Sequence, residues 1–172
     1  MRTVQETVEI AVPVRTAYNQ WTQFTVFPRF TRTVRHVDQV TPALTSWTVA
    51  LGPLRTEFQA EIAEQEPDAY LVWRSLGASP AHRGRVTFEP TADGGTAVTV
   101  RMDLAPAGRA GLLAAVPALP GRVVRGELLR FKRYIEGLGA ESGAWRGTIR
   151  GGRPKRPEPE RHESGVPHWP VG

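Results

Sequence analysis

Cysteine is absent from the 172 residues of this chain, so disulfide bonds, thiolate metal sites and a cysteine nucleophile are all excluded. Long apolar runs are missing as well. Residues 1–12 hold no stretch apolar enough for a signal peptide, and nothing approaches the roughly 20 apolar residues of a membrane span. We therefore expect a cytoplasmic protein without a transmembrane segment.

The sequence also lacks the motifs of several common enzyme classes. It contains no P-loop, no G-x-G-x-x-G after a predicted strand and no G-x-S-x-G elbow, which sets aside a nucleophile-based hydrolase. Its four histidines are scattered, without an H-x3-H pattern or paired carboxylates at the spacing of metal ligands. We expect no metal site and no cofactor.

Basic residues are in excess, but only slightly. The 22 lysines and arginines against 17 acidic residues give a formal charge of +5. A basic balance permits contact with nucleic acid or anionic lipid. Because this excess is modest and scattered along the chain, we do not expect nucleic-acid binding.

What the sequence does contain is hydrophobic periodicity. Residues 3–12 alternate apolar and polar side chains, which is the pattern of a half-buried strand, and Pro13 ends it. From Val14 to Phe30 aromatic residues recur at spacings of three, and Pro28 interrupts the series. This segment predicts two short helices in place of one long helix.

Residues 33–104 return to a period of two. Short alternating runs are separated by turn signals such as Thr41-Pro42 and Asp93-Gly94-Gly95. Tight turns between consecutive strands require antiparallel neighbours, because parallel strands need long crossovers. The predicted strands show their alternation over residues 34–40, 47–51, 54–62, 70–76, 83–89 and 96–104, and the third of them is closed near Pro67-Asp68.

Helical periodicity begins after Pro106 and continues to the end of the predicted domain. An apolar stripe runs from Leu112 to Leu138 opposite a face of charged side chains. Pro117 and Pro120 should break or kink this helix near its middle. The sequence therefore predicts one long amphipathic C-terminal helix.

The composition changes beyond residue 139. The last part of the chain is rich in Gly, Pro, Arg and Glu and holds too few apolar residues to bury a core. We predict a domain over residues 1–139 and a disordered tail over residues 140–172. The alternative for the start of this tail is that it packs on the domain through the apolar residues Trp145 and Ile149.

This order of elements predicts an α+β protein with the helix-grip fold. In such a fold a curved antiparallel sheet of about seven strands wraps around the long C-terminal helix, and the two short helices after the first strand plug one end. Many inward residues of the sheet cannot reach the helix, so we expect a cavity between them. Pockets of this kind have apolar walls with a few polar groups that orient the ligand.

Four segments carry a family resemblance: VEIAVPVRTAYNQWTQFTVFPRF (8–30), AEIAEQEPDAYLVWRS (60–75), GRVTFEPTADGGTAVTVRMDLAP (84–106) and ELLRFKRYIEG (127–137). They resemble the START-like (SRPBCC, helix-grip) superfamily, in particular its bacterial polyketide cyclase/dehydrase and lipid-transport branch. The resemblance implies the helix-grip fold and a hydrophobic cavity for a small molecule. It implies no single reaction, because members include aromatase/cyclases, lipid carriers and quinone chaperones.

Strand and helix parity selects the residues that would line this cavity. Trp47 and Trp73 are the largest of them, and each serves either as a wall that stacks on a planar ligand or as ordinary core packing. The residues that we expect to contact a ligand are Trp21, Phe27, Trp47, Phe58, Trp73, Ser75, Val86, Phe88, Val124, Leu128 and Phe131.

Two residues are candidates for acid-base chemistry. His82 shares its strand parity with apolar residues and is placed to orient or protonate a carbonyl group. Tyr134 lies on the long helix near the expected end of the cavity, where a phenol can donate a hydrogen bond. The alternative for His82 is a backbone or water partner near the strand end, and for Tyr134 it is plain packing.

Three functions remain open from the sequence. The first is binding of a lipid, polyketide or quinone-like molecule for carriage or storage. The second is a polyketide aromatase/cyclase or dehydratase, which needs a shaped, desolvating cavity and few acid-base groups. The third is a macromolecule-interaction module. It is motivated by the tail and by a basic helix face that also leaves transient membrane contact open, formed by Arg122, Arg125, Arg130, Lys132 and Arg133.

Overall fold

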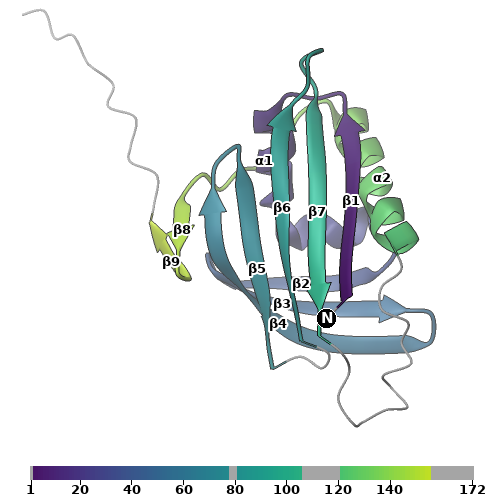
Figure 1. Ribbon diagram of the computed structural model, residues 1–172, viewed down its shortest axis with the longest axis vertical. Coiled ribbons are helices and arrows are strands. Elements are labelled where there is room, and N and C mark those ends of the chain that lie inside the picture. The colour runs from purple at the N-terminus through teal and green to yellow at the C-terminus, as the bar shows by residue number, and fades with distance from the viewer. Residues whose placement is uncertain (1, 78–80, 106–120, 156–172) are drawn as a thin grey trace, which may run out of the picture.

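The computed structural model describes residues 2–77, 81–105 and 121–155, and these ranges form one antiparallel sheet with helices packed against it (Figure 1). The helices are α1 (Val14–Trp21), the 3-10 helix η1 (Phe24–Arg29) and α2 (Gly121–Leu138). The strands are β1 (Arg2–Ile10), β2 (Val34–Thr41), β3 (Leu44–Leu51), β4 (Leu54–Glu66), β5 (Tyr70–Leu76), β6 (His82–Pro90), β7 (Thr96–Leu104), β8 (Thr148–Arg150) and β9 (Arg153–Lys155).

Seven strands form the main path of the sheet in the order β1-β7-β6-β5-β4-β3-β2, and all neighbours are antiparallel. Strand β4 is 13 residues long and has an irregularity between Ile62 and Glu64. Bulges of this kind bend a strand and increase its twist. In Figure 1, β1, β6 and β7 run upright while β2, β3 and β4 cross beneath them, so the sheet is strongly curved. The helix-grip architecture predicted from the sequence is confirmed.

Helix α2 packs against this sheet through one stripe of side chains. Val124, Leu128, Phe131 and Ile135 are buried and recur at spacings of four, three and four residues. Leu138, the predicted end of the stripe, is half exposed because it is the last helical residue. The predicted helical stretch before Gly121, with its two prolines, lies outside the described residues.

The two short helices predicted after the first strand are also present. Pro13 directly precedes α1 with a φ of −59°, the fixed backbone angle that suits a helix start. Tyr18 of α1 is fully buried, and Phe24 and Phe27 of η1 are buried against the same core. Neither α1 nor α2, the α-helices within the described ranges, has the length and apolar character needed to cross a bilayer.

The predicted boundary at residue 139 is wrong for the segment that follows it. Strand β8 pairs with Glu64 and Gln65 of β4, and Ile149 is fully buried. Strand β9 then closes a short hairpin with β8. Composition misled the prediction because this segment is held by one buried apolar side chain and by hydrogen bonds rather than by an apolar stripe. Residues 156–172 of the predicted tail lie outside the described residues.

Candidate functional site

A cavity of about 220 Å³ lies between the inner face of the sheet and α2. Aromatic and aliphatic side chains make most of its wall. Among the residues predicted to contact a ligand, the cavity is lined by Trp21, Phe27, Trp47, Phe58, Trp73, Val124, Leu128 and Phe131. The sequence therefore identified six of the eight Trp and Phe side chains that the described residues contribute to the wall, although no contact with a ligand follows from this geometry alone.

The aromatic side chains of the wall contact one another edge to face. The Trp21 ring centroid lies 5.3 Å from that of Phe27 and 5.1 Å from that of Phe131, with near-perpendicular planes. Phe27 meets Trp47 in the same way at 5.6 Å. Such pairs stabilise each other beyond the burial of their area, and they fix the ring orientations. The result is a wall that α1, η1, β3 and α2 build together.

Trp47 and Phe58 form the flat part of the wall. They are directly opposite each other on β3 and β4, and their rings are nearly parallel, with centroids 6.5 Å apart. The Trp47 indole Nε1 donates a hydrogen bond of 2.7 Å to Thr45 Oγ1. Because this bond satisfies the indole N–H within the protein, Trp47 can offer its apolar ring to a ligand without leaving a polar group unpaired.

Trp73 lies across the backbone of Gly84, its partner on the neighbouring strand β6. A Cβ atom at position 84 would fall between 2.0 and 2.6 Å from three carbon atoms of the Trp73 six-membered ring. Only glycine leaves this space. Gly84 thus allows the large Trp73 side chain to lie flat and still line the cavity.

His82 lies in the cavity wall at the start of β6. Its imidazole meets the Phe58 ring edge to face, with centroids 4.7 Å apart. Its backbone N–H donates a hydrogen bond of 2.9 Å to Ser75 Oγ. Ser75 is not among the residues that line the cavity, because its hydroxyl closes the end of the β5–β6 pair. The predicted ligand contact of Ser75 is therefore not supported.

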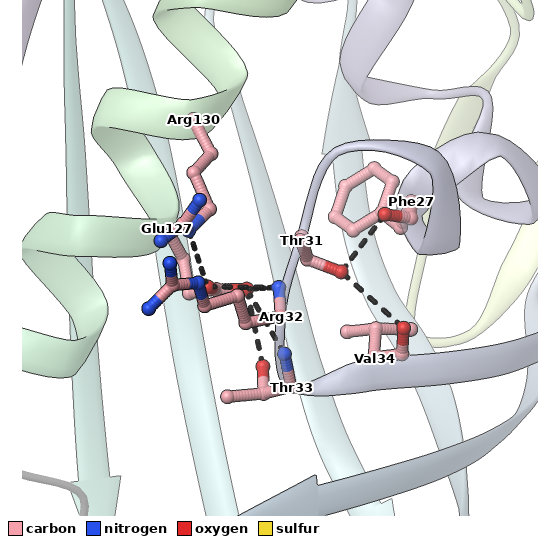
Figure 2. Close-up of polar contacts among 7 residues, drawn as sticks. All are labelled: Phe27, Thr31, Arg32, Thr33, Val34, Glu127 and Arg130. Atoms are coloured by element: carbon pink, nitrogen blue, oxygen red, sulfur yellow. Dashed lines mark hydrogen bonds and ion pairs between the residues drawn. The ribbon is translucent and has the colours of Figure 1, made fainter.

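A second polar patch of the wall consists of Thr31, Thr33 and Glu127 (Figure 2). One carboxylate oxygen of Glu127 accepts a hydrogen bond of 3.1 Å from the Arg32 amide. The other accepts bonds of 3.2 Å from the Arg32 amide and 3.2 Å from Thr33 Oγ1. Glu127 is the one Asp, Glu, Lys or Arg side chain among the described residues of this wall.

Three other predicted residues lie away from the cavity. Val86 and Phe88 point inward, but α1 covers this part of the sheet: Phe88 meets Tyr18 at 5.3 Å and Trp21 at 6.1 Å, which leaves no free space. Tyr134 packs on Phe30 with ring centroids 4.9 Å apart and does not line the cavity. The predicted hydrogen bond from Tyr134 to a ligand is therefore not supported by this arrangement, and its alternative, plain packing, fits it.

The sequence predicted nine of the 22 described residues that line the cavity and missed the other 13. Met102 and Val100 follow the inward parity of β7, and Phe24 and Phe30 belong to the aromatic series after Val14, so these residues carried a signal. Glu127 carried one as well, since it lies three residues after Val124 on the apolar stripe, where a charge is out of place. Ala60 shares the inward parity of Phe58, whereas Thr31, Thr33 and Thr45 carried no signal, because small polar residues fit any position.

A polar cluster packs behind α1, outside the cavity. Tyr18 Oη accepts a hydrogen bond of 2.8 Å from Gln65 Nε2, and burial raises the pKa of this phenol to about 12. Arg146 forms two bonds with the Asp68 carboxylate at 3.0 and 2.8 Å and one of 2.6 Å with Asn19 Oδ1. These contacts join the C-terminal segment to α1 and to the turn after β4.

Basic residues of α2 are partly neutralised by acidic neighbours. Arg130 Nε lies 3.5 Å from Glu127, and Arg125 lies 3.8 Å from Glu6 of β1. Lys132 Nζ pairs with Glu136 and donates a bond of 2.8 Å to the carbonyl oxygen of Glu9. In the described part of the chain, no three histidine or carboxylate side chains come close enough to hold a metal ion.

Comparison with known proteins agrees with this architecture. A family model described as polyketide cyclase/dehydrase and lipid transport matches residues 10–133. An uncharacterized 17.2 kDa protein of Streptomyces lincolnensis is 40% identical over 149 residues, which cover 87% of this chain and 99% of that protein.

Solved structures extend the comparison. A protein of Deinococcus radiodurans is 31% identical, with a TM-score of 0.62, and the match covers 81% of this chain and 99% of that one. The Zhui aromatase/cyclase from Streptomyces sp. R1128 gives a TM-score of 0.71 at 15% identity and covers 83% of this chain and 98% of its own. The second likeness concerns the fold alone.

Proposed function

This chain belongs to the polyketide cyclase/dehydrase and lipid transport family of START-like proteins, and from that premise we propose that it binds a compact hydrophobic molecule in the cavity for carriage or storage in the cytoplasm. The observation that supports this most directly is the wall itself. Eight of its side chains are aromatic carbocycles or indoles, namely Trp21, Phe24, Phe27, Phe30, Trp47, Phe58, Trp73 and Phe131. A wall of this kind recognises ring systems through stacking and edge contacts.

The size of the cavity narrows the ligand class. About 220 Å³ is below the roughly 300–1,000 Å³ of pockets that enclose drug-sized ligands. We therefore favour a compact ring-containing molecule, such as a quinone head group or a short cyclised polyketide, over a long extended acyl chain. A long-chain lipid would require the wall to move.

Native mass spectrometry of freshly purified protein tests the proposal. We expect a mass increase from a co-purified apolar molecule, or, for protein stripped of ligand, binding from a panel of quinones, aromatic polyketides and lipids. Ala60→Phe places a ring in the cavity and should abolish binding. Ala50→Phe on the same sheet is the control, since Ala50 does not line the cavity. Equal binding by both variants would contradict the proposal.

A second function, cyclisation or dehydration of a poly-β-ketone, is favoured by one observation. His82 places an imidazole beside the apolar side chains of the wall, where proton transfer to a carbonyl is shielded from bulk water. In a poly-β-ketone thioester an enol carbon attacks a second carbonyl of the same chain, the carbonyl oxygen is protonated, and the resulting β-hydroxyl group leaves as water with a proton from the neighbouring carbon. We expect this cyclisation to be slower with His82→Gln than with the control His36→Gln, whose ring is exposed and faces Asp38. Identical product formation by both variants would remove His82 from this chemistry.

A further inference from the structure

We propose that Thr31, Arg32 and Thr33 form a gate of the cavity and that the Glu127 carboxylate is the latch that holds it shut. The inference rests on the proposed function, because a gate matters only where a ligand passes. It concerns a different property, however. The residues of the cavity wall select the molecule that binds, whereas the gate sets the association and dissociation rates of that molecule.

The gate is a short irregular segment between η1 and β2. At its start, Thr31 donates through its amide and its hydroxyl to the carbonyl oxygen of Phe27, at 3.0 and 2.8 Å. At its end, the carbonyl oxygen of Thr33 accepts a bond of 2.8 Å from the Ala50 amide. These bonds tie the two ends of the gate to η1 and β3, whereas the Arg32 amide between them bonds to Glu127 of α2.

The latch is a single side chain that reaches from α2 to this segment (Figure 2). Glu127 accepts from the amides of Arg32 and Thr33, at 3.1 to 3.5 Å, and from the Thr33 hydroxyl at 3.2 Å. Arg130 lies 3.5 Å from the same carboxylate and holds it in place. Hydrogen bonds to an ionised acceptor are roughly twice as strong as neutral ones, so this contact fixes the gate against the helix.

The position of the latch is where the cavity wall meets solvent. Thr31, Thr33 and Glu127 line the cavity, whereas Arg32 between the two threonines is exposed. The Glu127 side chain keeps 19% of its surface exposed and that of Arg130 keeps 28%. Water can therefore replace the hydrogen bonds when the latch opens, which keeps the opening cost far below that of a fully buried charge.

Stopped-flow binding of the neutral fluorescent probe N-phenyl-1-naphthylamine tests this inference. With Glu127→Ala and Glu127→Gln we expect the association rate to rise by about tenfold, together with the dissociation rate, since one lost charge-assisted bond is of the order that changes a rate tenfold. A residue that only contacted the ligand would change the dissociation rate alone. An unchanged association rate would overturn the gate.

Glu136→Gln is the matched control. Glu136 also lies on α2 and also accepts a backbone N–H bond, 2.8 Å from Ala11, but it ties the helix to the β1–α1 connection and does not line the cavity. We expect its association rate to equal that of the unmodified protein. An equal acceleration by Glu136→Gln would show general loosening of α2 and would contradict a local gate.

A measurement without ligand separates the gate from the proposed function. Trp21, Trp47 and Trp73 line the cavity, so acrylamide, a small neutral quencher, should quench the fluorescence of Glu127→Ala more efficiently than that of Glu136→Gln. Failure of every hydrophobic probe to bind would count against the proposed function. If substitution of Glu127 changes neither the acrylamide quenching nor the association rate, the cavity opens elsewhere.

Discussion

At the residue scale, Gly84 is the position where a single added methyl group should disturb the cavity wall. A methyl group at this position would occupy the space of the Trp73 ring, which must then leave its place in the cavity wall. We expect Gly84→Ala to lower the free energy of unfolding by about 1–3 kcal/mol, as overpacked sites do, and to weaken binding of hydrophobic probes. Chemical denaturation and a shift in tryptophan emission measure the two effects.

Gly126→Ala is the control for Gly84→Ala. Gly126 lies inside α2, and a Cβ atom there would meet nothing within 4 Å. Because alanine favours the helix over glycine, this change should stabilise the protein by about 0.5–1 kcal/mol. If both substitutions stabilise the protein, the Trp73 ring can move aside without lowering the free energy of unfolding.

Tyr18 should make the protein sensitive to alkali. A tyrosine in the unfolded chain ionises near pH 10.0, whereas burial raises the pKa of Tyr18 to about 12. The folded state therefore holds its proton longer than the unfolded state. Stability from this group is complete below pH 10 and declines by about 3 kcal/mol as the pH rises through 12. Melting temperatures from pH 9 to 12 should fall more steeply for the unmodified protein than for Tyr18→Phe.

A residue of the cavity wall could be predicted from the sequence where its side chain is large and apolar and its position in the strand or helix faces inward. Trp21 on α1 and Trp47 and Trp73 on the sheet are large, apolar and on inward positions, and all three pack against the core as partly buried residues. Phe88 shows the limit of parity. It also points inward, but whether an inward residue meets free space or another element depends on the placement of α1, which no period in the sequence reports.

At the element scale, the hairpin of β8 and β9 belongs to the folded domain. Ile149 is fully buried and pairs with Gln65, so truncating its side chain leaves a hole behind β4. We expect Ile149→Ala to cost about 2–5 kcal/mol, the usual range for a buried isoleucine. Arg153→Ala on the exposed strand β9 should change stability by less than about 0.5 kcal/mol. Thermal unfolding of the two variants distinguishes a packed hairpin from a loose one.

The same hairpin shows which elements sequence periodicity can find. Strands β5 and β7 begin and end where alternation predicts, because every second side chain enters the core. Strand β4 ends at Glu66, next to the predicted stop at Pro67-Asp68, but its alternation is readable only as far as Ile62, because an irregularity shifts the parity after that residue. Strand β8 has three residues, too few to display any period, and its position depends on pairing with a strand far away in sequence.

At the scale of the whole molecule, ligand binding and stability are coupled. A ligand that binds the folded chain alone and is present at 100 times its Kd adds about 2.7 kcal/mol to the free energy of unfolding. For a domain of this size, that corresponds to a rise in Tm of roughly 5–10 °C. Ala60→Phe, with folding checked by circular dichroism, should show no such rise with the same ligand. Equal shifts in both proteins would indicate binding outside the cavity.

The pairing of β4 with β8 also has a consequence for synthesis. Gln65 and Arg150 are 85 positions apart, so at 5–20 residues per second the ribosome makes the partner strand about 4–17 s after this part of β4. During that interval the Glu64–Glu66 stretch is an open sheet edge, which could pair with another nascent chain. Both of its terminal residues are glutamates, and like charges repel a second copy of the same edge. The acidic end of β4 thus disfavours pairing between two nascent chains until β8 has been synthesised.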